Sequence, residues 1–186
     1  MKTEELSSQI YRVAKKAFLS HQPASAVGYS IQSHDTADSI SLVLLEENSL
    51  SDDLEASLFN IEEWSTFLES PELDALNSVI VSIYNEMDDY ENSPDWHHEF
   101  RELVFSSSLK ALKELREDLK EEGKNSSPYL MFWVAGSKLS EKEGKNWCAE
   151  LNGEEFGARF AAWQENESAK LKKLLDEFER TGNIET

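Results

Sequence analysis

The adjacent histidines His97 and His98 are the residues whose types most resemble a metal site. Neutral imidazoles are common ligands of transition metals. Neighbouring positions on a helix point about 100° apart, so these two rings cannot readily share one ion. The sequence contains no HExxH motif and no histidine four residues from either ring. We therefore expect one imidazole to pack against its neighbours and the other to be solvated.

A cluster of carboxylates precedes this pair in the sequence and could attract a cation such as Ca²⁺. The run lacks the glycine and the final glutamate of an EF-hand loop. No two carboxylates are distinguished by their spacing as a general acid and base. An acidic protein-binding face is the better interpretation of this cluster, which comprises Glu86, Asp88, Asp89, Glu91 and Asp95.

Two further segments resemble catalytic motifs only in part. Gly136-Ser137-Lys138 follows a predicted strand, but Met131 stands where a phosphate-binding loop has its first glycine, and the order is not GK[ST]. Cys148 has no CxxC partner, and no GxSxG motif is present. We predict no catalytic residue, no cofactor and no metal site, and we interpret Cys148 as a structural thiol.

The negative charge of the chain is confined to one part of it. The formal net charge is −19 at pH 7. Residues 17–100 contain 18 aspartates and glutamates and no lysine or arginine, whereas the other 102 residues hold 18 basic and 19 acidic side chains. Such a field repels nucleic acid and anionic membranes and accelerates encounter with a basic partner. An acidic surface that only maintains solubility is the alternative interpretation.

Composition indicates a folded protein. The 186 residues are 39% hydrophobic and include five tryptophans, which excludes a disordered chain. The single cysteine excludes an internal disulfide. The first residues are polar and acidic, unlike a signal peptide, and no run approaches the roughly 18 apolar residues of a membrane helix. We expect a soluble, cytoplasmic protein.

Three segments have the pattern of strands. Residues 27–31 alternate between apolar and small or polar side chains, which is typical of a half-buried strand. Residues 39–45 are expected to complete an antiparallel hairpin with them. Residues 129–135 are apolar on both faces, as in a strand in the middle of a covered sheet. The strands are expected at residues 25–32, 39–45 and 128–135. A further strand within Glu46–Phe59, which the pattern does not reveal, is left open as an alternative.

Periodic apolar residues predict helices around these strands. One covers Thr3–Ser20, and two others begin after Ser-Pro pairs, at Ser70-Pro71 and at Ser93-Pro94, with Gly123 ending the latter. Ser140 and Glu143 match a capping box and predict another helix start. A final helix or helix pair is expected to about Arg180. We predict a single α+β domain over residues 1–186, a small, mainly antiparallel sheet packed by several helices, with a frayed C-terminus from about residue 181.

The order of these elements resembles an uncharacterised bacterial family, the domain of unknown function numbered forty-three-zero-three. The residues that carry the resemblance are Val27-Gly28-Tyr29, Asn60–Trp64, and the Phe100–Gly123 helix that leads into Tyr129–Val134. The resemblance implies an immunity protein or an accessory protein of a toxin system, hence a binding protein rather than an enzyme. It implies no site residue, because Gly136-Ser137-Lys138 stands where relatives have an acidic residue.

The favoured hypothesis is a non-enzymatic inhibitor or immunity-type protein that neutralises a basic partner such as a toxin nuclease. One alternative is a hydrolase or nucleotide-handling enzyme without a recognisable motif. Another is a scaffold subunit that self-associates through a coiled-coil-like seam at residues 73–90. The side chains predicted to bind the partner are Glu46, Glu47, Asp52, Asp53, Glu86, Asp88, Asp89, Glu91 and Asp95.

Overall fold

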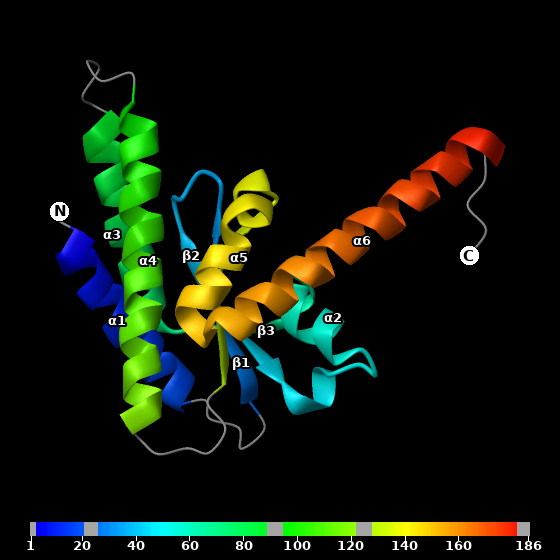
Figure 1. Cartoon of the computed structure of the whole chain (residues 1–186). Coiled ribbons are helices and arrows are strands. Elements are labelled where there is room, and N and C mark those ends of the chain that lie inside the picture. The colour runs from blue at the N-terminus through cyan, green and yellow to red at the C-terminus, as the bar shows by residue number, and fades with distance from the viewer. Residues whose placement is uncertain (1–2, 21–25, 89–94, 122–127, 182–186) are drawn as a thin grey trace.

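The structure is a computed structural model that describes residues 3–20, 26–88, 95–121 and 128–181. These ranges form six α-helices, four strands and two short 3₁₀ helices, arranged as a sheet between two layers of helices (Figure 1). The predicted α+β class is confirmed. The elements are α1 (Thr3–Ser20), β1 (Ala26–His34), β2 (Ile40–Glu46), η1 (Glu47–Ser49), α2 (Leu54–Phe59), η2 (Ile61–Glu63), β3 (Thr66–Leu68), α3 (Pro71–Asp88), α4 (Trp96–Glu121), β4 (Tyr129–Ala135), α5 (Lys138–Asn152) and α6 (Glu154–Thr181).

The sheet has the strand order β3-β2-β1-β4 and is mixed. β1 and β2 form the predicted antiparallel hairpin, with Tyr29 opposite Leu44. β3 adds to β2 in the antiparallel direction, and β4 pairs with β1 in the parallel direction. The strand that the sequence pattern missed is β3, which lies after Trp64 and not within residues 46–59. Three residues are too few to show an alternating pattern.

The two faces of the sheet are covered by different helices (Figure 1). One face is buried under α1, α3 and α4, where aliphatic side chains such as Ile10, Ile80 and Leu112 pack on Ile31 and Phe132. The other face is buried under α2, η2, α5 and α6 by a smaller core that is rich in aromatic residues. That smaller core consists of Val43, Leu45, Phe59, Ile61, Trp64, Tyr129, Met131, Trp133, Cys148 and Phe160.

β4 lies at the edge of the sheet, and the predicted central position was wrong. Its side chains are nevertheless buried on both faces, as predicted. The open edge is occupied by α5: the Asn152 amide bonds both the N–H and the C=O of Leu130, at 2.9 and 2.7 Å. The Ser140 hydroxyl does the same for Val134, at 2.7 and 3.0 Å. Two polar side chains therefore replace part of a missing strand and protect the edge from pairing with another chain.

These contacts also correct the predicted start of α5. The N-cap is Ser137, whose hydroxyl accepts from the Leu139 N–H at 3.2 Å, and not Ser140. Ser140 is buried within the first turn because the β4 backbone binds it. The helix ends at Gly153, which has a φ of +99° that favours glycine.

α6 is one continuous helix whose second half leaves the body of the protein (Figure 1). Its first half buries Phe160 in the aromatic core, whereas Leu171, Leu174 and Leu175 are exposed further along. The residues from 182 onward, where fraying was expected, lie outside the described ranges. None of the described helices is sufficiently long and apolar to cross a membrane.

Candidate functional surface

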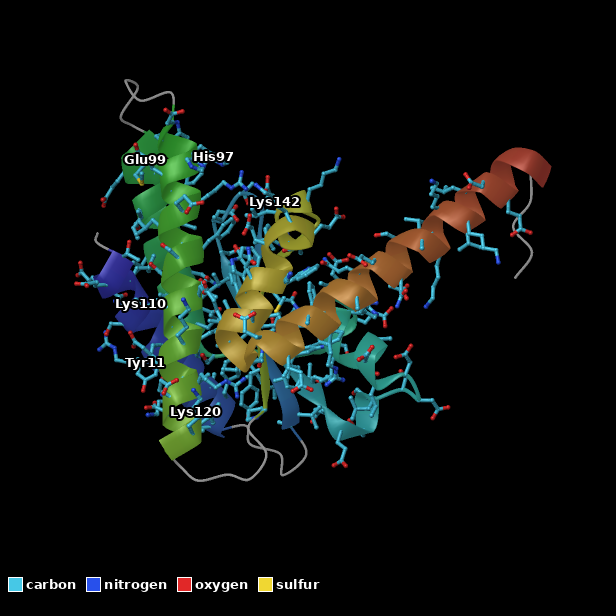
Figure 2. All side chains as sticks on the ribbon, in the orientation of Figure 1. Tyr11, His97, Glu99, Lys110, Lys120 and Lys142 are labelled. Atoms are coloured by element: carbon cyan, nitrogen blue, oxygen red, sulfur yellow. The ribbon has the colours of Figure 1, made fainter. Side chains whose placement is uncertain are left out.

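His97 and His98 lie in the first turn of α4, and Figure 2 labels His97 and Glu99 near the start of this helix. The His97 ring is half-buried and packs edge-on against the Trp96 indole, with 5.5 Å between ring centroids. His98 is exposed. Within the described ranges, no three His, Cys, Asp or Glu side chains are grouped to hold a metal ion. The pair therefore has the packed and solvated arrangement that the sequence predicts.

The Gly136-Ser137-Lys138 segment is a turn that begins a helix. Gly136 has a φ of +66°, a conformation that glycine adopts without steric cost. Ser137 then caps α5.

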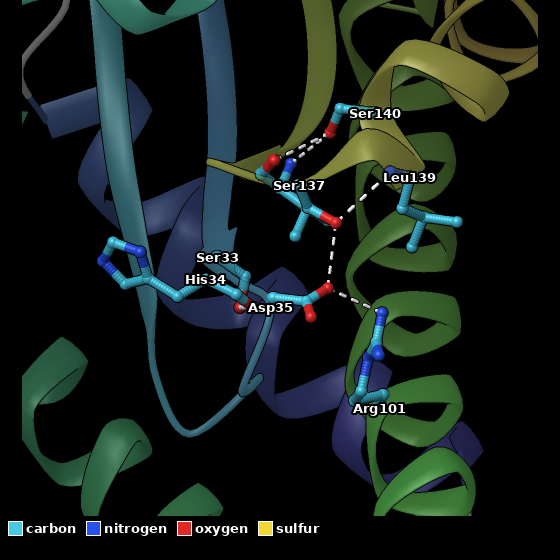
Figure 3. Close-up of polar contacts among 8 residues, drawn as sticks. Ser33, His34, Asp35, Arg101, Ser137, Leu139 and Ser140 are labelled. Atoms are coloured by element: carbon cyan, nitrogen blue, oxygen red, sulfur yellow. Dashed lines mark hydrogen bonds and ion pairs between the residues drawn. The ribbon is translucent and has the colours of Figure 1, made fainter.

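Ser137 also takes part in a polar cluster at the carboxyl ends of the parallel strands β1 and β4 (Figure 3). Its hydroxyl donates to Oδ1 of Asp35 at 2.9 Å, and Nη2 of Arg101 donates to the same oxygen at 2.7 Å. The cluster joins the β1–β2 turn to α4 and α5. Figure 3 shows the His34 ring pointing away from Ser137, so this histidine does not activate the serine as a nucleophile.

Cys148 is buried in the aromatic core with its Sγ 3.4 Å from the Tyr129 hydroxyl. Burial raises the pKa of the Cys148 thiol and that of the Tyr129 phenol. Both groups therefore keep their protons near neutral pH, and a protonated thiol is a poor nucleophile. These properties agree with a structural role for the cysteine.

The carboxylates predicted to bind a partner fall in two separate parts of the structure. Four of them lie where β2 ends and α2 begins, and we call Glu46, Glu47, Asp52 and Asp53 the α2 patch. Glu86 and Asp95 lie where α3 ends and α4 begins, on the opposite side of the sheet from α2 (Figure 1). The side chain of Asp88 and all of Asp89 and Glu91 lie outside the described residues.

Within the α2 patch, two carboxylates have local structural partners and two are free to meet a ligand. Asp53 caps α2 by accepting from the Ala56 N–H at 3.0 Å, and Glu46 accepts from the Thr66 hydroxyl at 3.1 Å. Glu47 and Asp52 are exposed. The second pair supplies the negative charge that this patch presents to solvent.

Few carboxylates of residues 17–100 are neutralised within the protein. In the described part of this segment, ion pairs form at Asp35 with Arg101, at Glu55 with Arg159 and at Glu72 with Lys16. The Lys16 ammonium lowers the pKa of Glu72. The cation comes from outside the segment in every case, because the segment itself has none. The remaining described carboxylates contribute an uncompensated negative surface.

Three exposed apolar side chains lie on the same acidic segment, and the sequence pattern did not reveal them. Leu54 and Phe67 are each 56% exposed, and Val81 is 43% exposed. Leu54 directly follows the α2 patch, and Phe67 lies on the edge strand β3 between the exposed Glu63 and Glu69. Phe67 could not be recognised as exposed, because its strand was too short to predict.

The resemblance to a bacterial family stays a prediction, as do the function and partner inferred from it. No protein-family model matches the chain, and no curated protein and no solved structure gives a significant match.

Proposed function

We propose that this chain is a non-enzymatic protein that binds a basic protein partner through its acidic segment, as an inhibitor or immunity-type protein that neutralises a toxin such as a nuclease would. The observation that carries the proposal is the surplus of exposed carboxylates on residues 17–100, where Asp35, Glu55 and Glu72 are the described carboxylates with an ion-pair partner. An uncompensated surface of one sign destabilises a compact protein, so a binding role gives a reason for it.

The α2 patch and β3 together have the composition of a protein interface. Interfaces are typically built from a few exposed apolar or aromatic anchors within a polar rim. Here Leu54 and Phe67 supply the anchors, and Glu47, Asp52 and Glu63 belong to the rim. The open edge of β3 also offers backbone hydrogen bonds to an added strand.

Charge and apolar contact would act on different kinetic steps. The carboxylates attract a cationic surface during encounter and raise the association rate, an effect that falls as salt screens the charges. The buried anchors determine how long the complex lasts, because affinity differences at one interface are mostly differences in dissociation rate. The acidic rim and Phe67 can therefore be tested separately.

The first experiment is capture of partners from the source cell at low and at high salt, with wild-type protein and two charge variants. The patch variant replaces four exposed carboxylates, as Glu47→Gln, Asp52→Asn, Glu63→Gln and Glu69→Gln. The matched control removes four exposed carboxylates elsewhere, as Glu102→Gln, Glu141→Gln, Glu155→Gln and Glu165→Gln. Each variant loses four negative charges, so the two have the same net charge.

We expect wild type and control to capture one basic protein in near-equal amount, and the patch variant to bind it with an association rate lower by about tenfold at low salt. Phe67→Ala should raise the dissociation rate, whereas Leu171→Ala, which removes a similarly exposed side chain from α6, should not. The captured protein should be toxic when expressed alone and harmless with its partner. Equal losses in the patch and control variants, or no basic partner at low salt, would contradict the proposal.

A further inference from the structure

A cavity of about 530 Å³ lies between the end of α4, the start of β4 and the turn from α5 to α6. The acidic segment contributes Val27 and Leu58 to its lining but none of its carboxylates, so the charged part of the cavity is distinct from the binding surface proposed above. Its apolar lining includes Val27, Leu58, Tyr129 and Phe156, and its cationic lining consists of Arg116 and Lys120 from α4. Figure 2 shows Lys120 near the end of α4.

Arg116 is a buried cation whose hydrogen-bond partners are neutral. Its side chain is only 7% exposed. Nε donates to the Leu151 carbonyl at 2.8 Å, and Nη2 donates to the Asn152 side-chain oxygen at 2.5 Å. Burial lowers the pKa of the guanidinium, although its ordinary pKa is so high that it stays charged. None of the described carboxylates forms an ion pair with it.

The end of α5 offsets part of this charge but not all of it. Leu151 and Asn152 belong to the last turn of α5, and a helix C-terminus carries roughly half a negative charge. A role in capping α5 therefore explains why Arg116 is there. It leaves a net positive charge at the wall of a cavity, and buried charges in proteins are normally paired with an opposite charge.

Among the side chains that the structure describes, the carboxylate that lines this cavity and that of Glu117, which follows Arg116, are already bound to lysines. Glu150 lines the cavity, but its carboxylate lies 2.7 Å from Nζ of Lys113. Glu117 lies 2.7 Å from Nζ of Lys120. Neither forms an ion pair with Arg116, although the nearby charge of Glu117 favours the charged guanidinium. The cavity therefore keeps a cationic wall within a protein of net charge −19.

We propose that this cavity binds a small organic carboxylate, with its charged end at Arg116 and Lys120 and its apolar body against Val27, Leu58 and Phe156. A guanidinium and an ammonium at one end of an apolar pocket match an anion that carries a hydrocarbon tail. Such a ligand would supply the missing negative charge and cover the apolar wall. A ligand cation is disfavoured by Arg116, and inorganic phosphate would leave the wall uncovered.

Hexanoate is a suitable probe, and backbone amide NMR of the full chain is a suitable readout. We expect saturable shifts at Tyr129, Asn152 and Phe156, with a dissociation constant on the order of 1 mM for so small a ligand. Hexan-1-ol, which keeps the tail and lacks the charge, and inorganic phosphate, which lacks the tail, should each bind at least about tenfold more weakly.

Lys120→Met removes one cation from the charged end and none of the hydrogen-bond partners of Arg116. Lys142→Met on α5 is the matched control, because that lysine is exposed and does not line the cavity. Lys120→Met should weaken hexanoate binding several-fold and leave hexan-1-ol binding unchanged. Lys142→Met should change neither. The proposal is wrong if hexanoate gives no saturable shifts at the cavity, or if hexan-1-ol binds as tightly as hexanoate.

Discussion

Residues 17–100 and residues 101–186 carry similar numbers of carboxylates, 18 and 17, but use charge in different ways. The first segment has no cation, and its described ion pairs all reach to residues outside it. The second has 14 cations: Lys113 on α4 pairs with Glu150 on α5, and Lys120 pairs with Glu117 one turn away on α4. The second segment therefore neutralises part of its own negative charge, whereas most of the described carboxylates on the first have no ion-pair partner.

Substitution of Arg116 is expected to have the largest effect on stability among the changes that test this comparison. Arg116→Met deletes two hydrogen bonds and leaves the Leu151 carbonyl without its donor inside the protein. We expect a loss of about 2–3 kcal/mol in the free energy of unfolding, measured by urea denaturation. Lys113→Met, on the same helix and exposed, should stay within about 0.5 kcal/mol of wild type. Similar losses in the two variants would show that burial does not distinguish these cations.

Asp35 is the carboxylate of the acidic segment that is most firmly tied to the other segment. Asp35→Ala removes the acceptor of both Arg101 and Ser137, and Nε of Arg101 is already buried without a partner. We expect a loss of about 1 kcal/mol, kept small because the Asp35 side chain is 55% exposed. Asp52→Ala should be neutral within error, since Asp52 is exposed in the α2 patch. A neutral Asp35→Ala variant would mean that the cluster in Figure 3 contributes nothing to stability.

Local periodicity predicted which side chains of α1 and β4 are buried but not which neighbouring elements bury them. The bounds of α1 and the burial of β4 on both faces followed from spacing alone. The edge position of β4 did not, because Asn152 and Ser140 satisfy its backbone from a helix that follows it in the sequence. The three residues of β3 were too few for any pattern.

The candidate site was only partly accessible to sequence reasoning for the same reason. The charge imbalance of residues 17–100 is visible in the sequence, and so were the carboxylates of the α2 patch. Their separation from Glu86 and Asp95 depends on where α2 and α3 lie in the fold. The cavity at Arg116 combines side chains from α4, β4 and α6 with the residue Val27, and no motif connects these segments.

Neutralising the acidic surface should slightly increase the stability of the protein, whereas the substitutions of Arg116 and Asp35 should decrease it. The patch variant with Glu47→Gln, Asp52→Asn, Glu63→Gln and Glu69→Gln removes charges that repel one another and that join no elements. We expect the free energy of unfolding to rise by no more than about 0.5 kcal/mol at low salt and to match wild type at high salt. A clear loss of stability would show that these carboxylates have structural partners, which would weaken the comparison between the segments.

The smallest effect concerns the link between α1 and α4, where Asp118 accepts hydrogen bonds from Lys15 and from Tyr11, which is labelled in Figure 2. The Lys15 ammonium and the Tyr11 hydroxyl lower the pKa of Asp118 in the folded state. A lowered folded-state pKa contributes stability that is present above the unfolded value of about 3.9 and is lost as the pH falls through the folded value. The stability of wild type should therefore fall in that acid range by more than the stability of Asp118→Asn does.

Asp52→Asn is the matched control for this pH dependence, because Asp52 is exposed in the α2 patch and the variant removes the same charge. Its stability should follow the wild-type curve through the acid range, apart from a slight relief of repulsion at neutral pH. Urea denaturation at a series of pH values measures both variants. If Asp52→Asn flattens the curve as much as Asp118→Asn, the acid sensitivity arises from the overall negative field and not from the ion pair. Charge in the two segments would then act on stability in the same way.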